Sequence, residues 1–269
     1  MATPLGSEFQ VNTFTTSNQS YPAIASNPLN SQFVVTWQSM GQDGSSNGIY
    51  AQRFSSTGSA EGNEFRVNSY TTDAQRYPAI AFAPSGEFVI TWMSFGQDGG
   101  GFGIYAQRFS SNGGPLNNEF RVNTYTTSPQ FNPAIAFSPL NNEFVVTWQS
   151  DNQDGSGFGI YAQRFSSTGS AEGNEFRVNT YTINEQRYPA ISYSPGGEFV
   201  VVWQSFGQDG SDGGLYAQRF SSTGSALGNE FRVNTYTNRQ PTQSGDRFCP
   251  QRRVCHHLEQ LWSRWGPNW

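Results

Sequence analysis

The feature of this sequence that most constrains its fold is a unit that occurs four times in tandem. One tryptophan marks each copy, and successive tryptophans are 55, 56 and 55 residues apart, at Trp37, Trp92, Trp148 and Trp203. Each copy opens with the same Pro-Ala-Ile phrase, at Pro22, Pro78, Pro133 and Pro189. A fixed period of this size indicates repeated supersecondary units rather than one irregular core.

Within one copy, the residue pattern predicts four β-strands. In the second copy Ala79–Phe82 is a short apolar run that ends at a turn, and Glu87–Trp92 alternates apolar and polar residues. A glycine-rich loop separates this segment from a second alternating run, Ile104–Phe109, and Glu119–Thr124 follows a polar connection. The short aromatic strands and glycine-rich turns predict an all-β fold.

We predict a β-propeller-like array of four-stranded antiparallel blades, with one repeat domain over residues 1–237. The expected blades are about 22–69, 78–124, 133–180 and 189–235. Glu8–Thr13 has the sequence of a fourth strand but precedes the first copy, so we expect it to be the outer strand of the last blade and to close the ring. An open arc is the alternative, and its exposed blade edges would favour self-association.

The repeat pattern ends after residue 237. A metal site is one interpretation of the last segment, because it holds both cysteines and both histidines, Cys249, Cys255, His256 and His257, but their spacing fits no common zinc pattern. If this last segment is translated back into suitable synonymous codons and these are read one nucleotide later, the new amino-acid sequence closely matches residues 72–99. We therefore interpret residues 238–269 as a frameshifted fifth repeat and expect them to be disordered.

Composition excludes two classes of partner. The chain has no lysine and a net charge of −5, which disfavours nucleic acid because phosphate contacts need basic side chains. It has no run of 18 apolar residues, so no membrane insertion is expected. The first residues do not have the pattern of a signal peptide. We therefore expect that the chain starts inside a longer array or that its export signal lies elsewhere.

The repeated Gly-Gln-Asp-Gly loops are the candidate metal sites. One aspartate recurs at the same position in each loop, as Asp43, Asp98, Asp154 and Asp209. Calcium would need six to eight oxygen ligands, and each loop supplies one recurrent carboxylate. The alternative is that each aspartate accepts hydrogen bonds from its own loop backbone and stabilises the turn.

Two further repeated sets are candidate ligand-binding residues. The arginines are Arg53, Arg108, Arg164 and Arg219, and the tyrosines are Tyr50, Tyr105, Tyr161 and Tyr216. As an alternative, the arginines pair with carboxylates on the outer strand, such as Glu64, Glu119, Glu175 and Glu230. We expect the four repeated tryptophans to belong to the blade core rather than to form sugar platforms.

The in-frame repeats contain no histidine, cysteine or lysine, which removes the usual catalytic bases and nucleophiles. The conspicuous acidic residues occur four times each, whereas a catalytic site needs one set of groups. We therefore predict a protein that is not an enzyme and that binds glycans or a surface protein at several equivalent sites. A spacer without a specific ligand and a calcium-stabilised module remain the alternatives.

The phrases VNTYTT, PAIAFSP, FVVTWQS, GQDGSGFGIYAQRF and GNEFRVNT resemble tandem repeats of very large secreted or surface bacterial proteins, described as hemolysin-type calcium-binding or adhesin-like. The resemblance covers residues 8–237, and the order of strand phrases is also similar to the blades of WD-repeat propellers. It implies an extracellular location, calcium association and an adhesive, lectin-like role. The chain lacks the GGxGxD nonapeptides that carry calcium in such proteins.

Overall fold

The computed structural model describes residues 6–210 and 212–235. These residues form sixteen β-strands and no helix, grouped into four antiparallel sheets of four strands each. The prediction of an all-β, propeller-like array is therefore confirmed. No helix in the described part of the chain is long and apolar enough to cross a membrane.

Each repeat forms one sheet, which we call a blade. Blade 1 contains β1 (Gln19–Ser26), β2 (Phe33–Met40), β3 (Asn47–Phe54) and β4 (Ala60–Arg66). Blade 2 contains β5 (Gln75–Phe82), β6 (Phe88–Phe95), β7 (Phe102–Phe109) and β8 (Pro115–Arg121). Blade 3 contains β9 (Gln130–Phe137), β10 (Phe144–Asp151), β11 (Phe158–Phe165) and β12 (Ala171–Arg177). Blade 4 contains β13 (Gln186–Tyr193), β14 (Phe199–Ser205), β15 (Gly214–Phe220) and β16 (Ala226–Arg232).

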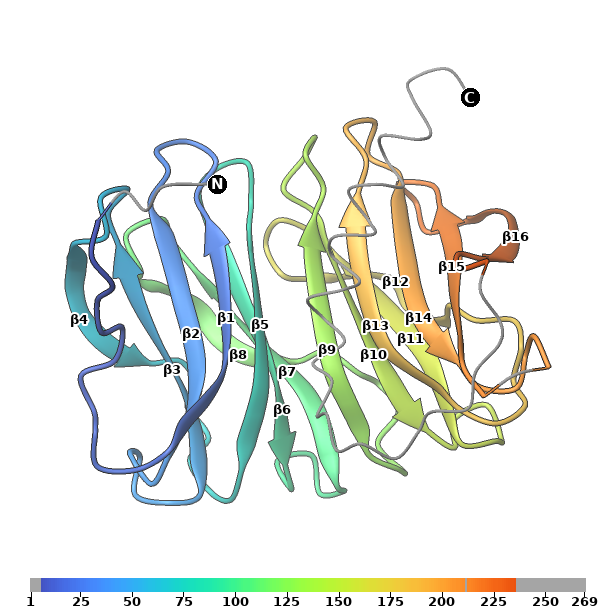
Figure 1. The fold of residues 1–269 in the computed structure, drawn as a ribbon, viewed down its shortest axis with the longest axis horizontal. Coiled ribbons are helices and arrows are strands. Elements are labelled where there is room, and N and C mark those ends of the chain that lie inside the picture. The colour runs from blue at the N-terminus through green and yellow to red at the C-terminus, as the bar shows by residue number, and fades with distance from the viewer. Residues whose placement is uncertain (1–5, 211, 236–269) are drawn as a thin grey trace.

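The first strands of successive blades line a common axis. In every blade the strands pair in sequence order, and β1 packs against β5, β5 against β9, and β9 against β13. Figure 1 shows these four strands in the middle of the view, with the other strands of blade 1 to the left and those of blade 4 to the right. Within the described residues, β13 does not pack against β1 in the same way, so the four blades form an open arc.

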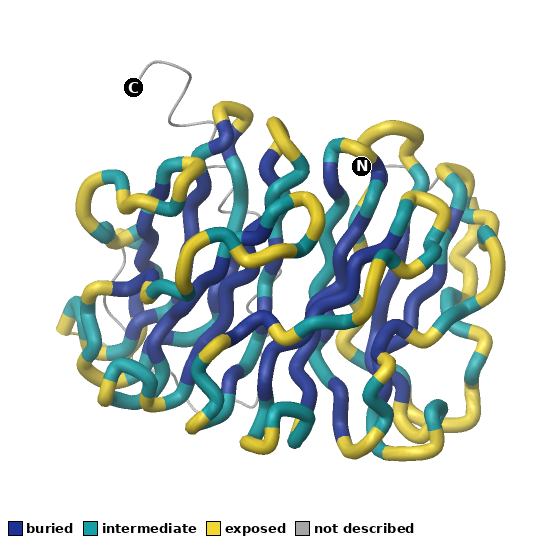
Figure 2. Tube along the Cα trace, turned by 180° about the vertical axis from the view of Figure 1, so that it is seen from behind, coloured by how far each residue is buried: buried dark blue, intermediate teal, exposed yellow. Residues whose placement is uncertain are grey.

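The hydrophobic core lies between neighbouring blades. Trp92 and Phe88 of blade 2, both fully buried, pack against Val34 and Ile49 of blade 1. Equivalent clusters join blade 2 to blade 3 and blade 3 to blade 4. Figure 2 shows that the buried residues follow the strands and that the exposed residues gather in the loops at the sheet ends. The repeated tryptophans therefore belong to the core, as expected.

Two strand boundaries differ from the prediction. The first strand of blade 2 begins at Gln75, before Pro78, so the proline lies inside the strand. The fourth strand is β8, Pro115–Arg121, rather than residues 119–124. The chain leaves this ladder early because Asn123 turns inward, and its Oδ1 accepts a hydrogen bond from Ile104 N at 2.7 Å. A buried side-chain amide thus replaces the next backbone pairing.

The segment Glu8–Thr13 is not a strand in this structure. It nevertheless packs on blade 1 as each outer strand packs on the following blade: the Phe9 and Phe54 ring centroids are 5.4 Å apart. Thr13 N also donates to Glu64 Oε2 at 2.6 Å. Because no described strand lies beside this segment, it cannot form a ladder, although its side-chain contacts are preserved. Ring closure by this segment stays a prediction, and residues 238–269 lie outside the described residues.

Candidate functional site

The loop aspartates predicted as metal ligands fold back onto their own turns. Asp43 Oδ1 accepts a hydrogen bond from Ser45 N at 3.2 Å, and Asp98 Oδ1 accepts one from Gly100 N at 3.1 Å. A Cβ added to Gly103 would lie 2.6 Å from Asp98 Oδ2, so the glycine makes room for the carboxylate. The same arrangement recurs at Gly48, Gly159 and Gly214.

This geometry does not fit a calcium shell. The four aspartates lie in four different blades, and the described residues contain no group of three or more His, Cys, Asp or Glu side chains that could hold a metal. In blade 4 the side chain of Asp209 lies 3.8 Å from the guanidinium of Arg232. An arginine beside a single carboxylate offers a cation no further oxygen ligands. The groups around the loop aspartates are therefore those of a hydrogen-bonded turn and not those of a calcium site.

The four repeated tyrosines are buried, with 6–7% of their surface exposed, at Tyr50, Tyr105, Tyr161 and Tyr216. Tyr50 packs within blade 1, and the other three lie in the core between neighbouring blades. Burial and the nearby charge of Asp98 raise the pKa of Tyr105 to about 12. Burial and Asp154 raise the pKa of Tyr161 to about 12 in the same way. A ligand would reach Tyr105, Tyr161 and Tyr216 only by separating two blades. Their position therefore gives no support to the predicted ligand role.

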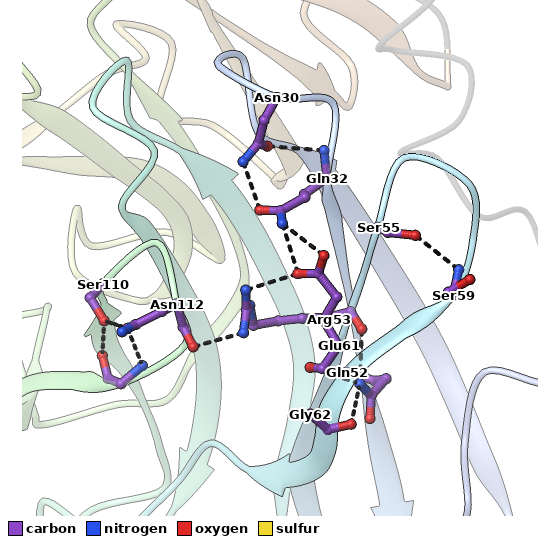
Figure 3. A network of polar contacts seen from close by, with 11 residues as sticks. Asn30, Gln32, Gln52, Arg53, Ser55, Ser59, Glu61, Gly62, Ser110 and Asn112 are labelled. Atoms are coloured by element: carbon purple, nitrogen blue, oxygen red, sulfur yellow. Dashed lines mark hydrogen bonds and ion pairs between the residues drawn. The ribbon is translucent and has the colours of Figure 1, made fainter.

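Three of the four repeated arginines connect neighbouring blades, and the fourth, Arg219, forms an ion pair within blade 4. Arg53 Nη1 donates to the backbone oxygen of Asn112 in the β7–β8 hairpin at 2.8 Å, and Arg53 Nη2 pairs with Glu61 at 3.0 Å (Figure 3). Arg108 and Arg164 donate to the equivalent hairpins of the next blades, at Thr168 and Thr223. Arg53, Arg108 and Arg164 thus each connect their blade to the following one, whereas Arg219 pairs with Glu198 within blade 4.

The particular glutamates expected to pair with these arginines were wrong, although Arg53 and Arg164 do pair with outer-strand carboxylates. Arg108 pairs with Glu87 at 3.1 Å rather than with Glu119, and the partners of the others are Glu61, Glu143, Glu172 and Glu198. Glu119 instead accepts a hydrogen bond from Ser69 N of the preceding blade at 2.5 Å. The register explains the difference, because the residue opposite the arginine on the outer strand is a glutamate in blades 1 and 3 but a leucine in blades 2 and 4. In blades 2 and 4 the arginine pairs instead with Glu87 or Glu198, which directly precedes the second strand.

The residues that converge at the axis are four that the sequence analysis did not select. Each stands directly before the strand proline, and each has a positive φ of 52–55°: Tyr21, Tyr77, Asn132 and Tyr188. We call this set the axial site. Positive φ is uncommon for residues with side chains and costs free energy. All four blades therefore hold the same strained backbone at the same place.

The proline explains the strain. In blade 2 the pairing between β5 and β6 is interrupted between Arg76 and Ala79, where Tyr77 and Pro78 form a bulge. Proline has no N–H to donate to the ladder, so a strand tolerates it only at an edge or a bulge. Bulges redirect side chains. Here the bulge places the tyrosine of one blade against that of the next.

Two axial tyrosines touch each other. The ring centroids of Tyr21 and Tyr77 are 4.3 Å apart, and Tyr77 Oη donates a hydrogen bond to Tyr21 Oη at 3.3 Å. Burial, with the hydrogen bond to Tyr21, raises the pKa of Tyr77 to about 12, and Tyr188 contributes through its charge. Tyr21 is 46% exposed, while Tyr77 and Tyr188 are half-buried. The site therefore carries aromatic rings and hydroxyl groups at the axis lined by β1, β5, β9 and β13, and we call the space along this axis the channel.

Glutamines from the second strands hold the bulges in place. Gln38 Oε1 accepts a hydrogen bond from Tyr77 N of the next blade at 3.2 Å. Gln149 Oε1 accepts one from Tyr188 N at 3.0 Å. The backbone of each of these two tyrosines is thus bound to the preceding blade. Side chains whose backbone is fixed in this way lose less conformational entropy when they bind a ligand.

Blade 3 breaks the symmetry of the axial site. It carries Asn132 in place of a tyrosine, and Asn132 Nδ2 donates to Gln149 Oε1 at 3.0 Å. The backbone N–H of Asn132 meets the sulfur of Met93 at 3.4 Å, where other blades have a glutamine. The site is therefore three tyrosines around one amide rather than a uniform ring.

Further along the same strands the channel becomes apolar. A pocket of about 520 Å³ is lined there by residues of all four first strands, among them Ala25, Ile80, Ile135 and Ile191. The first strands β1, β5, β9 and β13 carry no Asp or Glu. Besides apolar residues and the arginines Arg76 and Arg187, these strands thus carry aromatic, hydroxyl and amide side chains.

A signal for the axial site was present in the sequence. Tyr-Pro occurs in three copies and Asn-Pro in the other, within a segment that otherwise has strand character. Proline inside a strand pattern predicts a bulge, and a bulge predicts a redirected side chain. The sequence analysis began each strand at the proline, so the preceding residue was left out.

Comparisons with known proteins identify the fold. No family model and no curated protein sequence matches this chain. Among solved structures, a Dyadobacter fermentans protein of unknown function has a TM-score of 0.61 at 8% identity, covering 83% of this chain and 71% of that one. A Bacteroides thetaiotaomicron endo-arabinase has a TM-score of 0.53 at 15% identity, covering 85% of both chains. An N-acetylgalactosamine deacetylase from F. plautii, in complex with blood group B trisaccharide, has a TM-score of 0.53 at 10% identity, covering 84% and 73%.

These similarities place the chain among propeller folds that include proteins acting on glycans. They also correct the prediction that the protein is not an enzyme. That prediction took blade repetition and the lack of histidine, cysteine and lysine as grounds for exclusion, yet an endo-arabinase and a deacetylase have this fold. Enzymes thus occur with this repeated blade architecture, so the exclusion is wrong.

Proposed function

We propose that this protein is an extracellular glycan-recognition module that binds its ligand at the axial site. The observation that carries the proposal is the convergence of three tyrosines, Tyr21, Tyr77 and Tyr188, on the axis of a propeller fold. Partly exposed aromatic rings accept the apolar face of a sugar, and the adjacent hydroxyl groups and Asn132 supply polar partners.

The geometry also changes the expected stoichiometry. The sequence analysis predicted several equivalent binding sites because each candidate residue occurs four times. The axial residues of the four blades instead face one shared channel. We therefore expect one glycan to bind per chain. Through this single site the protein would adhere to a glycan-bearing surface.

The test is a glycan array followed by calorimetric titration of the ligands that bind. The array includes arabinan fragments and galactosamine-containing oligosaccharides, because structures with this fold act on arabinan or amino sugars. We expect a stoichiometry of one, and about tenfold weaker binding for Tyr77→Ala or Tyr188→Ala. The same samples are analysed for released sugars or acetate.

The matched control is Leu140→Ala, which removes a 64% exposed apolar side chain from the β9–β10 turn at the opposite end of blade 3. This variant should bind as the unmodified protein does. Absence of binding to any glycan would contradict the proposal and favour a spacer or a protein ligand. Binding that survives both tyrosine substitutions would place the site elsewhere.

A further inference from the structure

Four phenylalanines form a continuous series of ring contacts across blades 2 and 3. The centroids of Phe95 and Phe102 are 5.1 Å apart, those of Phe102 and Phe131 are 5.7 Å apart, and those of Phe131 and Phe158 are 5.7 Å apart. The guanidinium carbon of Arg187 in blade 4 lies 4.8 Å from the centroid of Phe158. We call the four phenylalanines the aromatic track.

The track reaches solvent. Phe95 is 41% exposed, and Phe102, Phe131 and Phe158 are half-buried. By contrast, the repeated core phenylalanine Phe88 is fully buried. Phe102 and Phe131 also pack against the core between blades 2 and 3, so core packing accounts for part of the series but not for its exposed outer end at Phe95.

The track also departs from the repeat. The positions that correspond to Phe102 are Asn47 in blade 1 and Gly213 in blade 4, and the positions that correspond to Phe131 are Ser20, Arg76 and Arg187. A residue required by the blade core would recur in all copies, as the tryptophans do. The phenylalanines of the track instead lie in the two middle blades of the arc, blades 2 and 3.

The track leads to the axial site. Phe131 directly precedes Asn132 on β9, and Arg187 directly precedes Tyr188 on β13. Phe95 ends β6 and Phe102 begins β7, at the same end of blade 2 where β5 begins. The aromatic rings and the axial tyrosines thus share one end of the propeller.

The charges along the track are already paired. Arg187 forms an ion pair with Glu185 at 2.6 Å while it lies over Phe158. An arginine that is paired in this way adds little net attraction for an acidic sugar. The surface therefore suits the apolar faces of uncharged sugar rings better than carboxylated or sulfated ones.

We propose that the aromatic track is an extended subsite for a linear, uncharged oligosaccharide whose end lies in the axial site. This inference rests on the proposed function. Successive rings in contact offer stacking positions for successive sugars, as aromatic side chains do for the bases of single-stranded nucleic acids. The protein should then discriminate glycans by length as well as by sugar type.

The experiment compares disaccharides with octasaccharides of the neutral arabinose, xylose, mannose and glucose series by calorimetric titration. We expect the longer member of the bound series to bind at least about tenfold more tightly. In the Phe102→Ala/Phe131→Ala double variant, the octasaccharide affinity should fall to that of the disaccharide, while the disaccharide affinity stays unchanged. Phe95→Ser, at the exposed end of the track, should weaken only the octasaccharide and guards against a folding defect in the double variant.

Met40→Ala is the matched control, because Met40 is 53% exposed and occupies in blade 1 the position of Phe95. It should leave both affinities unchanged. Equal affinity for short and long members in the unmodified protein would overturn the extended subsite and leave the axial site in place. Failure of all eight sugars to bind would overturn the subsite for uncharged oligosaccharides, while the axial site is overturned only if the glycan array also shows no binding.

Discussion

At the scale of single residues, the carboxylate of Asp98 shows how a loop side chain can serve as structure. Its Oδ1 accepts the Gly100 N–H, and its Oδ2 lies over Gly103, which must lack a side chain. Burial of the Tyr105 hydroxyl raises its pKa, and the negative charge of Asp98 raises this pKa further. One aspartate therefore organises a turn, a strand start and an inter-blade tyrosine.

We expect Asp98→Ala to lower the free energy of unfolding by about 1 kcal/mol, because a side-chain-to-backbone hydrogen bond is lost. The loss should be the same in calcium and in chelator, and the melting temperature of the unmodified protein should not depend on calcium. Thermal melts in both buffers measure this. Asp151→Ala, outside the turn hydrogen bond, is the control. A calcium-dependent rise in the melting temperature that Asp98→Ala abolishes would restore the metal interpretation.

At the scale of elements, Arg108 connects blade 2 to blade 3. Arg108 is 9% exposed, and it binds both Glu87 in its own blade and the Thr168 carbonyl in the next. Arg219 occupies the same strand position in blade 4 and pairs with Glu198, but no hairpin of a further blade lies beyond it in the described part of the chain. The two arginines thus differ in one contact.

We expect Arg108→Ala to destabilise the protein by about 2 kcal/mol, because a hydrogen bond from a charged and largely buried guanidinium to a backbone carbonyl is lost. Arg219→Ala should cost less than about 1 kcal/mol, since it removes only a partly exposed ion pair. Urea unfolding of the two variants measures the difference. Equal losses would show that the inter-blade hydrogen bond adds nothing to the ion pair.

At the scale of the whole molecule, every blade junction buries a tyrosine, and this couples stability to pH. The pKa of Tyr105 and of Tyr161 is raised to about 12, against an ordinary value of 10.0. Above pH 10 the unfolded chain loses protons that the folded chain retains. The stabilisation is therefore present in full below about pH 10 and is lost as the pH rises toward 12.

We expect the free energy of unfolding to stay level up to about pH 10 and to fall between about pH 10 and 12. Urea titrations across this range measure the slope, and absorbance of tyrosinate reports ionisation directly. Tyr105→Phe should make the slope shallower, because phenylalanine has no proton to lose. A free energy of unfolding that stays constant through this range would contradict burial of the hydroxyl groups.

The open arc is the other whole-molecule feature. The outer strands β4, β8, β12 and β16 lie at sheet edges, and self-association through such edges stays a prediction. Closure of the ring through residues 8–13 stays one as well. The contacts of Phe9 and Thr13 with blade 1 show that this segment takes the place of a preceding outer strand.

The sequence by itself determined the number of blades, the strand count and the core tryptophans, because local alternation and a regular period are properties of the chain alone. The turn role of Asp98 was also open to inference, since Asp-Gly is local chemistry. The partners of Arg108 and the convergence of Tyr21, Tyr77, Asn132 and Tyr188 were not, because they depend on how one blade sits beside the next. Residues about one repeat apart in sequence meet at an axis that only the tertiary structure creates.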